Sequence, residues 1–218
     1  MLSGMREWID REGSRHLERF AQQGWNAWIP NVNPAQEAFL AGARAALEQA
    51  LAAPAARMGY RRWGFKEIRY NGVAAALLQT LFPEASIVVL IRHPGDALRS
   101  IKVTSWYERE FGGRPESFLA VWAANSSSLV EWASKRGGAL VLRYEELIAS
   151  PKEVVALVAK HVGIDARRFD PAAIATRVRG AANGPAPEPA PLNARDRAAL
   201  ATPGVRRTAL ALGYQLDL

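Results

Sequence analysis

Apolar residues gather in two short runs that predict strands. The first run covers residues 86–91 and the second covers residues 139–144. Both are rich in Val, Leu and Ile, which is typical of strands buried on both faces of a sheet. Around them, apolar residues recur at the spacing of amphipathic helices. Strands separated by helices pair in parallel through right-handed crossovers, so the pattern predicts an α/β fold.

Prolines and glycines set the expected boundaries of the helices. Pro94 and Pro151 suit the first turn of a helix, and Gly112-Gly113 breaks one. We also expect a strand over residues 63–68 and a flexible loop over residues 180–191. The expected helices cover residues 6–23, 35–53, 72–82, 94–111, 116–135, 152–162 and 193–213, the last with a break at Pro203-Gly204.

Composition narrows the class of protein. The 218 residues suit one domain and include 28 Lys and Arg against 21 Asp and Glu, a formal net charge of +7. This excess favours an anionic partner, although the basic residues are scattered and equally suit a solvated face. The chain has no cysteine, which excludes disulfides and thiolate metal sites.

Several other classes are disfavoured by what the sequence lacks. No apolar run has the length of a membrane span and no signal peptide is recognisable, so we expect a cytoplasmic protein with no membrane partner. The three histidines show no metal-ligand spacing, and we expect no metal. No Gly-x-x-x-x-Gly-Lys-Ser/Thr motif occurs, which argues against a nucleotide kinase. No groove-reading helix or RNA-binding motif indicates a nucleic-acid partner, and the oligomeric state is not predicted.

The end of the first strand carries the residues best suited to bind an anion. Arg92 follows the strand directly, His93-Pro94-Gly95-Asp96 forms a turn signal, and Ser100 lies in the next expected helix. Anionic ligands collect where the carboxyl end of a parallel strand faces a helix N-terminus. A guanidinium and a hydroxyl placed there can hold a phosphate between them. The alternative is that Arg92 is an ordinary surface residue at the end of a strand.

A second candidate pair lies in the expected strand over residues 63–68. Lys66 can reach an anion, with its neighbour Glu67 as a base or an orienting group. The alternative is an exposed ion pair of little energetic value. Because side chains alternate along a strand, we expect Glu67 on the opposite face from Lys66.

Three segments together resemble the sulfotransferase family. Val88–Ser100 resembles the family's 3′-phosphate-binding signature, an Arg-x-Pro-x-Asp run that ends in a serine. Leu142–Leu147 resembles its Arg-Tyr-Glu-Asp-Leu segment, and Trp63–Glu67 is similar to the strand whose lysine lies near the sulfuryl group. The closing Leu212-Gly213-Tyr214 also suits bacterial members. The resemblance covers residues 60–165 well and the ends loosely.

The resemblance implies one sulfotransferase-like domain over residues 1–218, with a parallel sheet flanked by helices in a P-loop-like fold. It implies an enzyme that transfers a sulfuryl group from its co-substrate, 3′-phosphoadenosine-5′-phosphosulfate, to a hydroxyl or amine of a small-molecule, glycan or peptide acceptor. Arg92 and Ser100 would bind the 3′-phosphate and Tyr144 would lie near the adenine. Lys66 would lie near the transferring group, where its charge stabilises the leaving phosphate.

Two departures from the family pattern leave alternatives open. Many members have a histidine base at the position of Ile68, so Glu67 is the nearest candidate for a catalytic base. The Pro-x-Ser-Gly-Thr-Thr type loop that cradles the 5′-phosphosulfate is not found, so we expect the fold without its first βα unit. The alternative function is a non-catalytic nucleotide-binding or interaction protein on the same scaffold.

Overall fold

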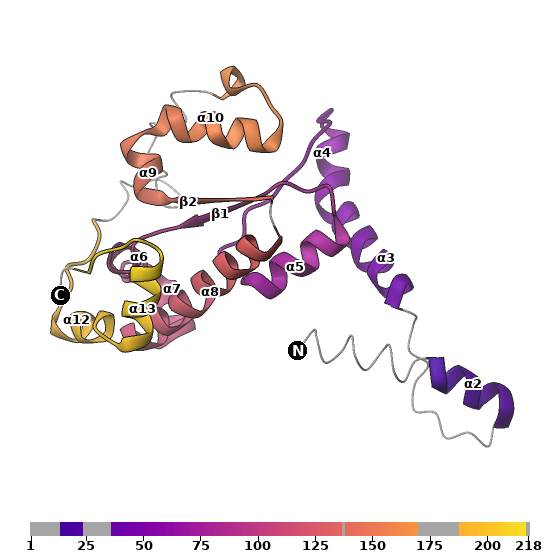
Figure 1. Cartoon of the computed structure of the whole chain (residues 1–218), viewed down its shortest axis with the longest axis horizontal. Helices are drawn as coiled ribbons and strands as arrows, with labels where there is room; N and C mark the ends of the chain where they lie inside the picture. The colour runs from indigo at the N-terminus through magenta and orange to yellow at the C-terminus, as the bar shows by residue number, and fades with distance from the viewer. Residues whose placement is uncertain (1–13, 24–35, 137, 170–187, 217–218) are drawn as a thin grey trace. The chain divides into compact units, whose positions relative to one another are not determined.

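The structure is a computed structural model that describes residues 14–23, 36–136, 138–169 and 188–216 (Figure 1). The chain divides into two compact units. The first comprises Met1–Ile68 and Ala76–Ala85, and the second comprises Arg69–Ala75 and Ser86–Leu218. Residues 6–13 of the first expected helix and residues 180–187 of the expected loop lie outside the described residues.

Two parallel strands form the sheet of the second unit (Figure 1). β1 (Ile87–Ile91) pairs with β2 (Ala139–Arg143) in register over its full length. Ile91 lies opposite Arg143, so both strands end at the same edge of the sheet. Both strands and their parallel pairing were predicted from the apolar runs, and the structure confirms them.

The prediction that β1 is buried on both faces is wrong. Val89 and Ile91 are each 5% exposed, whereas Val88 and Leu90 are 37% and 49% exposed. Helix α8 (Pro115–Arg136) contacts both strands, whereas α9 (Tyr144–Ala149) contacts β2. β1 therefore alternates between buried and exposed side chains, as a strand covered by a helix on one face does.

Helix α8 is the centre of the helical layer in the second unit. It packs against α6 (Pro94–Ile101), α7 (Ser105–Phe111), α12 (Ala194–Leu200) and α13 (Pro203–Ala211). This packing fixes α6, whose first turn follows the end of β1. The buried cluster between these helices consists of Leu98, Tyr107, Leu119, Ala123, Ala199, Leu200 and Val205.

The single helix expected over residues 94–111 is wrong, because the structure has two helices there. The break lies at Lys102–Thr104, where no glycine or proline signals it. The Thr104 hydroxyl donates to the carbonyl oxygen of Ile101 at 2.7 Å, and its backbone N–H donates to the same oxygen at 2.9 Å. These bonds replace the next helical turn and let the chain change direction.

A helix absent from the sequence expectations follows β2 directly. α9 (Tyr144–Ala149) places Tyr144 in a first helical turn, whereas the sequence placed this residue at the end of a strand. Glu146 stabilises the start of α9, because its carboxylate accepts from the Arg143 backbone N–H at 3.4 Å and from the Arg143 side chain at 2.8 Å. The turn after β2 is therefore helical from its first residue.

The C-terminal end of α10 (Pro151–Val162) is bonded to the start of β1. His161 Nε2 lies 3.0 Å from the carbonyl oxygen of Ile87, and the Ser86 hydroxyl donates to the carbonyl of His161 at 3.3 Å. A short 3-10 helix, η4 (Ala166–Arg168), follows. No helix within the described ranges is long and apolar enough to cross a membrane.

Helices dominate the described part of the first unit. α2 (Ser14–Gln23) is followed by α3 (Gln36–Leu47), a π-helix, η3 (Glu48–Ala52), and α4 (Ala53–Arg57). The last three form the expected helix over residues 35–53 and extend it. Helix α5 (Gly72–Leu81) begins in the second unit and ends in the first.

Arg44 joins α3 to the end of α5 within the first unit. Its guanidinium donates to Glu48 at 2.9 Å, to Glu84 at 3.0 Å and to the carbonyl oxygen of Leu81 at 2.9 Å. Its Cζ also lies 4.9 Å from the centroid of the Phe82 ring. These contacts hold Phe82 in a buried position, against which the next segment packs.

Candidate functional site

Three side chains bond to backbone groups of the three consecutive residues Ile91–His93, where β1 ends. The Tyr214 hydroxyl donates to the first carbonyl of this turn at 3.1 Å, and Trp122 Nε1 donates to the second carbonyl at 3.1 Å. The last backbone N–H donates to Glu145 Oε1 at 2.8 Å. These side chains come from the C-terminal segment, α8 and α9, so three separate parts of the second unit hold one turn.

Arg92 lies in the middle of this turn. Its backbone carbonyl has a hydrogen-bond partner, whereas part of its side chain has none. Its Nε is buried and has no hydrogen-bond partner. Its Cζ lies 4.7 Å from the centroid of the Tyr144 ring, so the guanidinium covers an aromatic face. A buried N–H without a partner is unfavourable by about 1–3 kcal/mol. An anionic acceptor would satisfy this donor, so the residues present fit a phosphate group.

The residues predicted to bind a nucleotide are all in the second unit. Arg92 and Tyr144 are in contact, as described. Ser100 is half-buried near the end of α6, about 9 Å along the helix axis from Pro94. Arg92 and Ser100 can both donate hydrogen bonds to an anion. We therefore expect a bound anion, and not a direct hydrogen bond, to connect the two side chains. The positive end of α6 adds a favourable field for negative charge.

The carboxylate of Glu145 connects the turn to the C-terminal segment. Besides accepting the His93 N–H, it lies 3.0 Å through Oε2 from the Tyr214 hydroxyl, whose single proton is shared between this oxygen and the Ile91 carbonyl. Tyr214 is 5% exposed, and burial together with the negative charge of Glu145 raises its pKa well above the ordinary range. The hydroxyl therefore stays protonated and remains a donor. Sequence reasoning did not assign Glu145 or Tyr214 to the site, although both lie in segments that carried the family resemblance.

Further bonds hold the C-terminal segment at the ends of both strands. Arg143 pairs with Glu146 at 2.7 Å and donates to the carbonyl of Gly213 at 3.4 Å. The hydrogen bond from Arg143 holds the pKa of Glu146 below its usual range. His93 Nε2 lies 3.0 Å from the carbonyl oxygen of Gln215, so the ring donates through this nitrogen. Gly213 has a φ of +75°, a conformation that favours glycine at this turn.

The predicted catalytic pair, Lys66 and Glu67, lies in the first unit, and the strand expected to carry it is wrong. Residues 63–68 form an irregular segment in which Lys66 is exposed and Glu67 is half-buried. The pattern suited a strand, but the ladder of the described sheet joins β1 to β2 alone. Glu67 Oε1 accepts from the adjacent N–H of Ile68 at 2.8 Å. Strand alternation therefore does not determine the faces of Lys66 and Glu67.

Aromatic packing holds this segment in place of backbone pairing. The rings of Trp63 and Phe65 stack with centroids 6.4 Å apart and an interplanar angle of 12°. Trp63 also meets the buried ring of Phe82 edge-on, with centroids 5.5 Å apart. The residues that precede Lys66 are thus anchored to the first unit.

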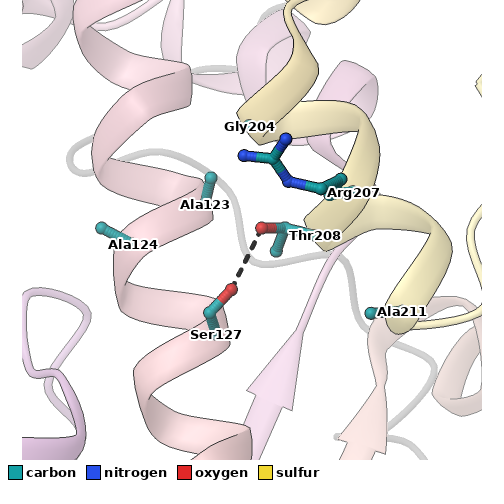
Figure 2. A pocket seen from close by; sticks show the side chains of 7 residues that line it. All are labelled: Ala123, Ala124, Ser127, Gly204, Arg207, Thr208 and Ala211. Carbon is teal, nitrogen blue, oxygen red and sulfur yellow. Dashed lines mark hydrogen bonds between the residues drawn. The ribbon is translucent and has the colours of Figure 1, made fainter.

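A surface depression of about 430 Å³ lies elsewhere on the second unit, between α8 and α13 (Figure 2). The hydroxyls of Ser127 and Thr208 lie 3.0 Å apart across it, and the Arg207 side chain lies beside them (Figure 2). Its other lining residues are glycine and alanine. It contains none of the residues predicted for the site, and we assign no function to it.

Comparison with known proteins identifies one family. A model of the sulfotransferase family matches residues 2–168 of the chain. Neither the curated proteins nor the solved structures give a significant match. Among the residues that the structure describes, no group of three or more His, Asp or Glu side chains is arranged to hold a metal ion.

Proposed function

Since the chain belongs to the sulfotransferase family, we propose that it transfers a sulfuryl group from 3′-phosphoadenosine-5′-phosphosulfate to a hydroxyl or amine. The buried and unpartnered Nε of Arg92, held over Tyr144, is the observation that most supports a nucleotide donor. We further propose that residues 1–218 act as one domain in the cytoplasm. The acceptor would be a small molecule, a glycan or a peptide.

Within this proposal, the second unit binds the nucleotide. Arg92 donates to the 3′-phosphate, and the Ser100 hydroxyl donates to the same group from α6. Tyr144 presents its aromatic ring near the adenine and supports the guanidinium. A charge-assisted hydrogen bond contributes about 1.5–3 kcal/mol, so the 3′-phosphate should dominate recognition.

Lys66 and Glu67 are the proposed catalytic pair. When bound, the donor supplies an activated sulfuryl group on its 5′-phosphate. Lys66 places a positive charge where negative charge develops on the leaving phosphate oxygen. Glu67 accepts the proton that the acceptor hydroxyl or amine loses. The chemistry is positioning and electrostatic stabilisation, as in phosphoryl transfer.

Calorimetry with two nucleotides tests the nucleotide site. The protein should bind 3′-phosphoadenosine 5′-phosphate at least about tenfold more tightly than adenosine 5′-phosphate, because only the first reaches Arg92 with a phosphate. Arg92→Ala should abolish this difference, whereas Arg168→Ala, an exposed arginine after α10, should preserve it. Equal affinity of the wild type for both nucleotides would refute the site.

Transfer of labelled sulfate to a panel of hydroxyl and amine acceptors tests catalysis. Lys66→Ala should lose transfer while retaining affinity for 3′-phosphoadenosine 5′-phosphate. Lys152→Ala, an exposed lysine in the first turn of α10, is the matched control and should keep both. Nucleotide binding by the wild type without transfer to any acceptor would instead favour a non-catalytic nucleotide-binding protein on the same scaffold.

A further inference from the structure

We propose that Tyr214 and Glu145 are positioning residues that hold the turn around Arg92, which makes the C-terminal segment part of the nucleotide site. This proposal rests on the proposed function, because it concerns how the 3′-phosphate site is built. It adds two residues that contact neither the nucleotide nor the transferring group in the proposed scheme. Their role is to fix the backbone from which the guanidinium extends.

The first argument is where the hydrogen bonds of the turn come from. The β1–β2 ladder ends at Ile91, and α6 begins at Pro94. Between them, three backbone groups are held by side chains. Tyr214 and Glu145 supply two of these bonds, and Trp122 supplies the third. A site must hold its contacting side chain within about 0.5 Å of the productive geometry, and such supporting bonds provide this precision.

The second argument is the contrast between the backbone and the side chain of Arg92. Three backbone groups of the turn, the carbonyls of Ile91 and Arg92 and the N–H of His93, have side-chain partners, whereas the buried Nε of Arg92 has none. A turn under stability constraints alone would satisfy this donor as well. The arrangement instead leaves the Nε of Arg92 without a partner while the backbone around it is fixed, which lowers the entropy lost on binding an anion.

The third argument concerns charge. A carboxylate beside a phosphate site repels the anion. Its presence there therefore calls for another role, such as holding the backbone of the turn. Both oxygens of Glu145 accept hydrogen bonds, one from the His93 N–H and one from the Tyr214 hydroxyl. The Arg143 guanidinium lies over the Tyr214 ring, with its Cζ 6.0 Å from the ring centroid. Glu145 is thus engaged in the structure of the turn.

Hydroxyl deletion tests the role of Tyr214. Tyr214→Phe should weaken binding of 3′-phosphoadenosine 5′-phosphate by about three- to tenfold, the range for one neutral hydrogen bond, and leave binding of adenosine 5′-phosphate unchanged. Tyr107→Phe is the matched control, because Tyr107 is also buried but belongs to the cluster around α8. It should leave the ratio of the two affinities unchanged.

Rescue by a conservative variant tests Glu145. Glu145→Ala should lower the affinity ratio as Tyr214→Phe does. Glu145→Gln should largely restore it, because the amide oxygen can accept from His93 and the amide nitrogen can donate to the Tyr214 oxygen. Glu153→Ala, an exposed glutamate in the first turn of α10, should have no effect on the ratio.

The outcomes separate this inference from the proposed function. If the wild type discriminates between the nucleotides but Tyr214→Phe and Glu145→Ala weaken both equally, their role is structural and the inference is wrong. If the wild type does not discriminate, the proposed site itself is wrong. Should Tyr214→Phe fail to fold, as circular dichroism would show, Glu145→Ala against Glu145→Gln gives the same test, and equal ratios for the two would refute the inference.

Discussion

The ion pair between Lys102 and Asp196 should be the most costly polar interaction to break in the second unit. Lys102 directly follows α6, and Asp196 lies in the first turn of α12. Lys102 Nζ lies 2.5 Å from Asp196 Oδ2, and the Asn193 backbone N–H donates to the same oxygen at 2.8 Å. Two helices far apart in sequence are thus joined through one buried carboxylate.

Lys102 and Asp196 differ in the exposed fraction of their side chains, and this difference determines how much unfolding free energy each substitution should cost. The Asp196 side chain is 1% exposed, whereas that of Lys102 is 15% exposed. Lys102→Met leaves a buried carboxylate with the Asn193 bond, so unfolding free energy should fall by about 3 kcal/mol, the low end for a broken buried pair. Asp196→Asn leaves an ammonium that can extend toward water, so the loss should be about 1–2 kcal/mol.

Urea unfolding followed by circular dichroism measures these differences, with the m-value checked for each variant. The double variant should lose about 2 kcal/mol less than the sum of the single losses, since neither charge is then left alone. Additive losses within about 0.5 kcal/mol would refute this reasoning. A larger loss for Asp196→Asn than for Lys102→Met would contradict the argument from exposure.

Two further predictions concern packing and pH. Gly72→Ala should destabilise the protein by about 1–3 kcal/mol in the same urea assay, because the new Cβ would clash with the backbone carbonyl oxygen of Ser128. Gly204→Ala, where a Cβ meets nothing within 4 Å, is its control, and an equal loss there would contradict the explanation. Burial raises the pKa of Tyr214 above its unfolded value near 10, so its contribution to stability is complete below pH 10 and lost as pH rises further. Stability measured from pH 9 to 12 should therefore fall less steeply in Tyr214→Phe, and an identical slope would show that Tyr214 does not titrate as described.

The pattern of apolar residues predicted those helices and strands whose formation depends mainly on residues close together in the sequence. The apolar runs of β1 and β2 and the helical spacing of α8 were visible in the sequence, and their structures agree. The break at Lys102–Thr104 was not visible, because a threonine hydroxyl ends the helix there without a glycine or proline. The expected strand over residues 63–68 was wrong because a strand also needs a pairing partner, which composition does not reveal.

In the candidate site, too, residues within one sequence motif were predicted, whereas contacts between distant segments were not. Arg92 was predicted from its place at the end of the first strand and Tyr144 from the resemblance, and the structure adds that the guanidinium covers the ring. Glu145 was overlooked because its bond to Tyr214 joins residues 69 positions apart. The bond from Tyr214 to Ile91 spans 123 positions. Contacts of this kind depend on how the C-terminal segment packs, and no spacing rule predicts them.

The most direct test of the central claim observes the 3′-phosphate itself. Phosphorus NMR of bound 3′-phosphoadenosine 5′-phosphate resolves the 3′- and 5′-phosphates in one sample, and each has a second pKa near 6 when free, by analogy with other phosphate monoesters. Contact with the Arg92 guanidinium should lower the pKa of the 3′-phosphate, and Arg92→Ala should return it to its free value. A 3′-phosphate that titrates in the wild-type complex as it does in solution would contradict the claim that Arg92 binds it.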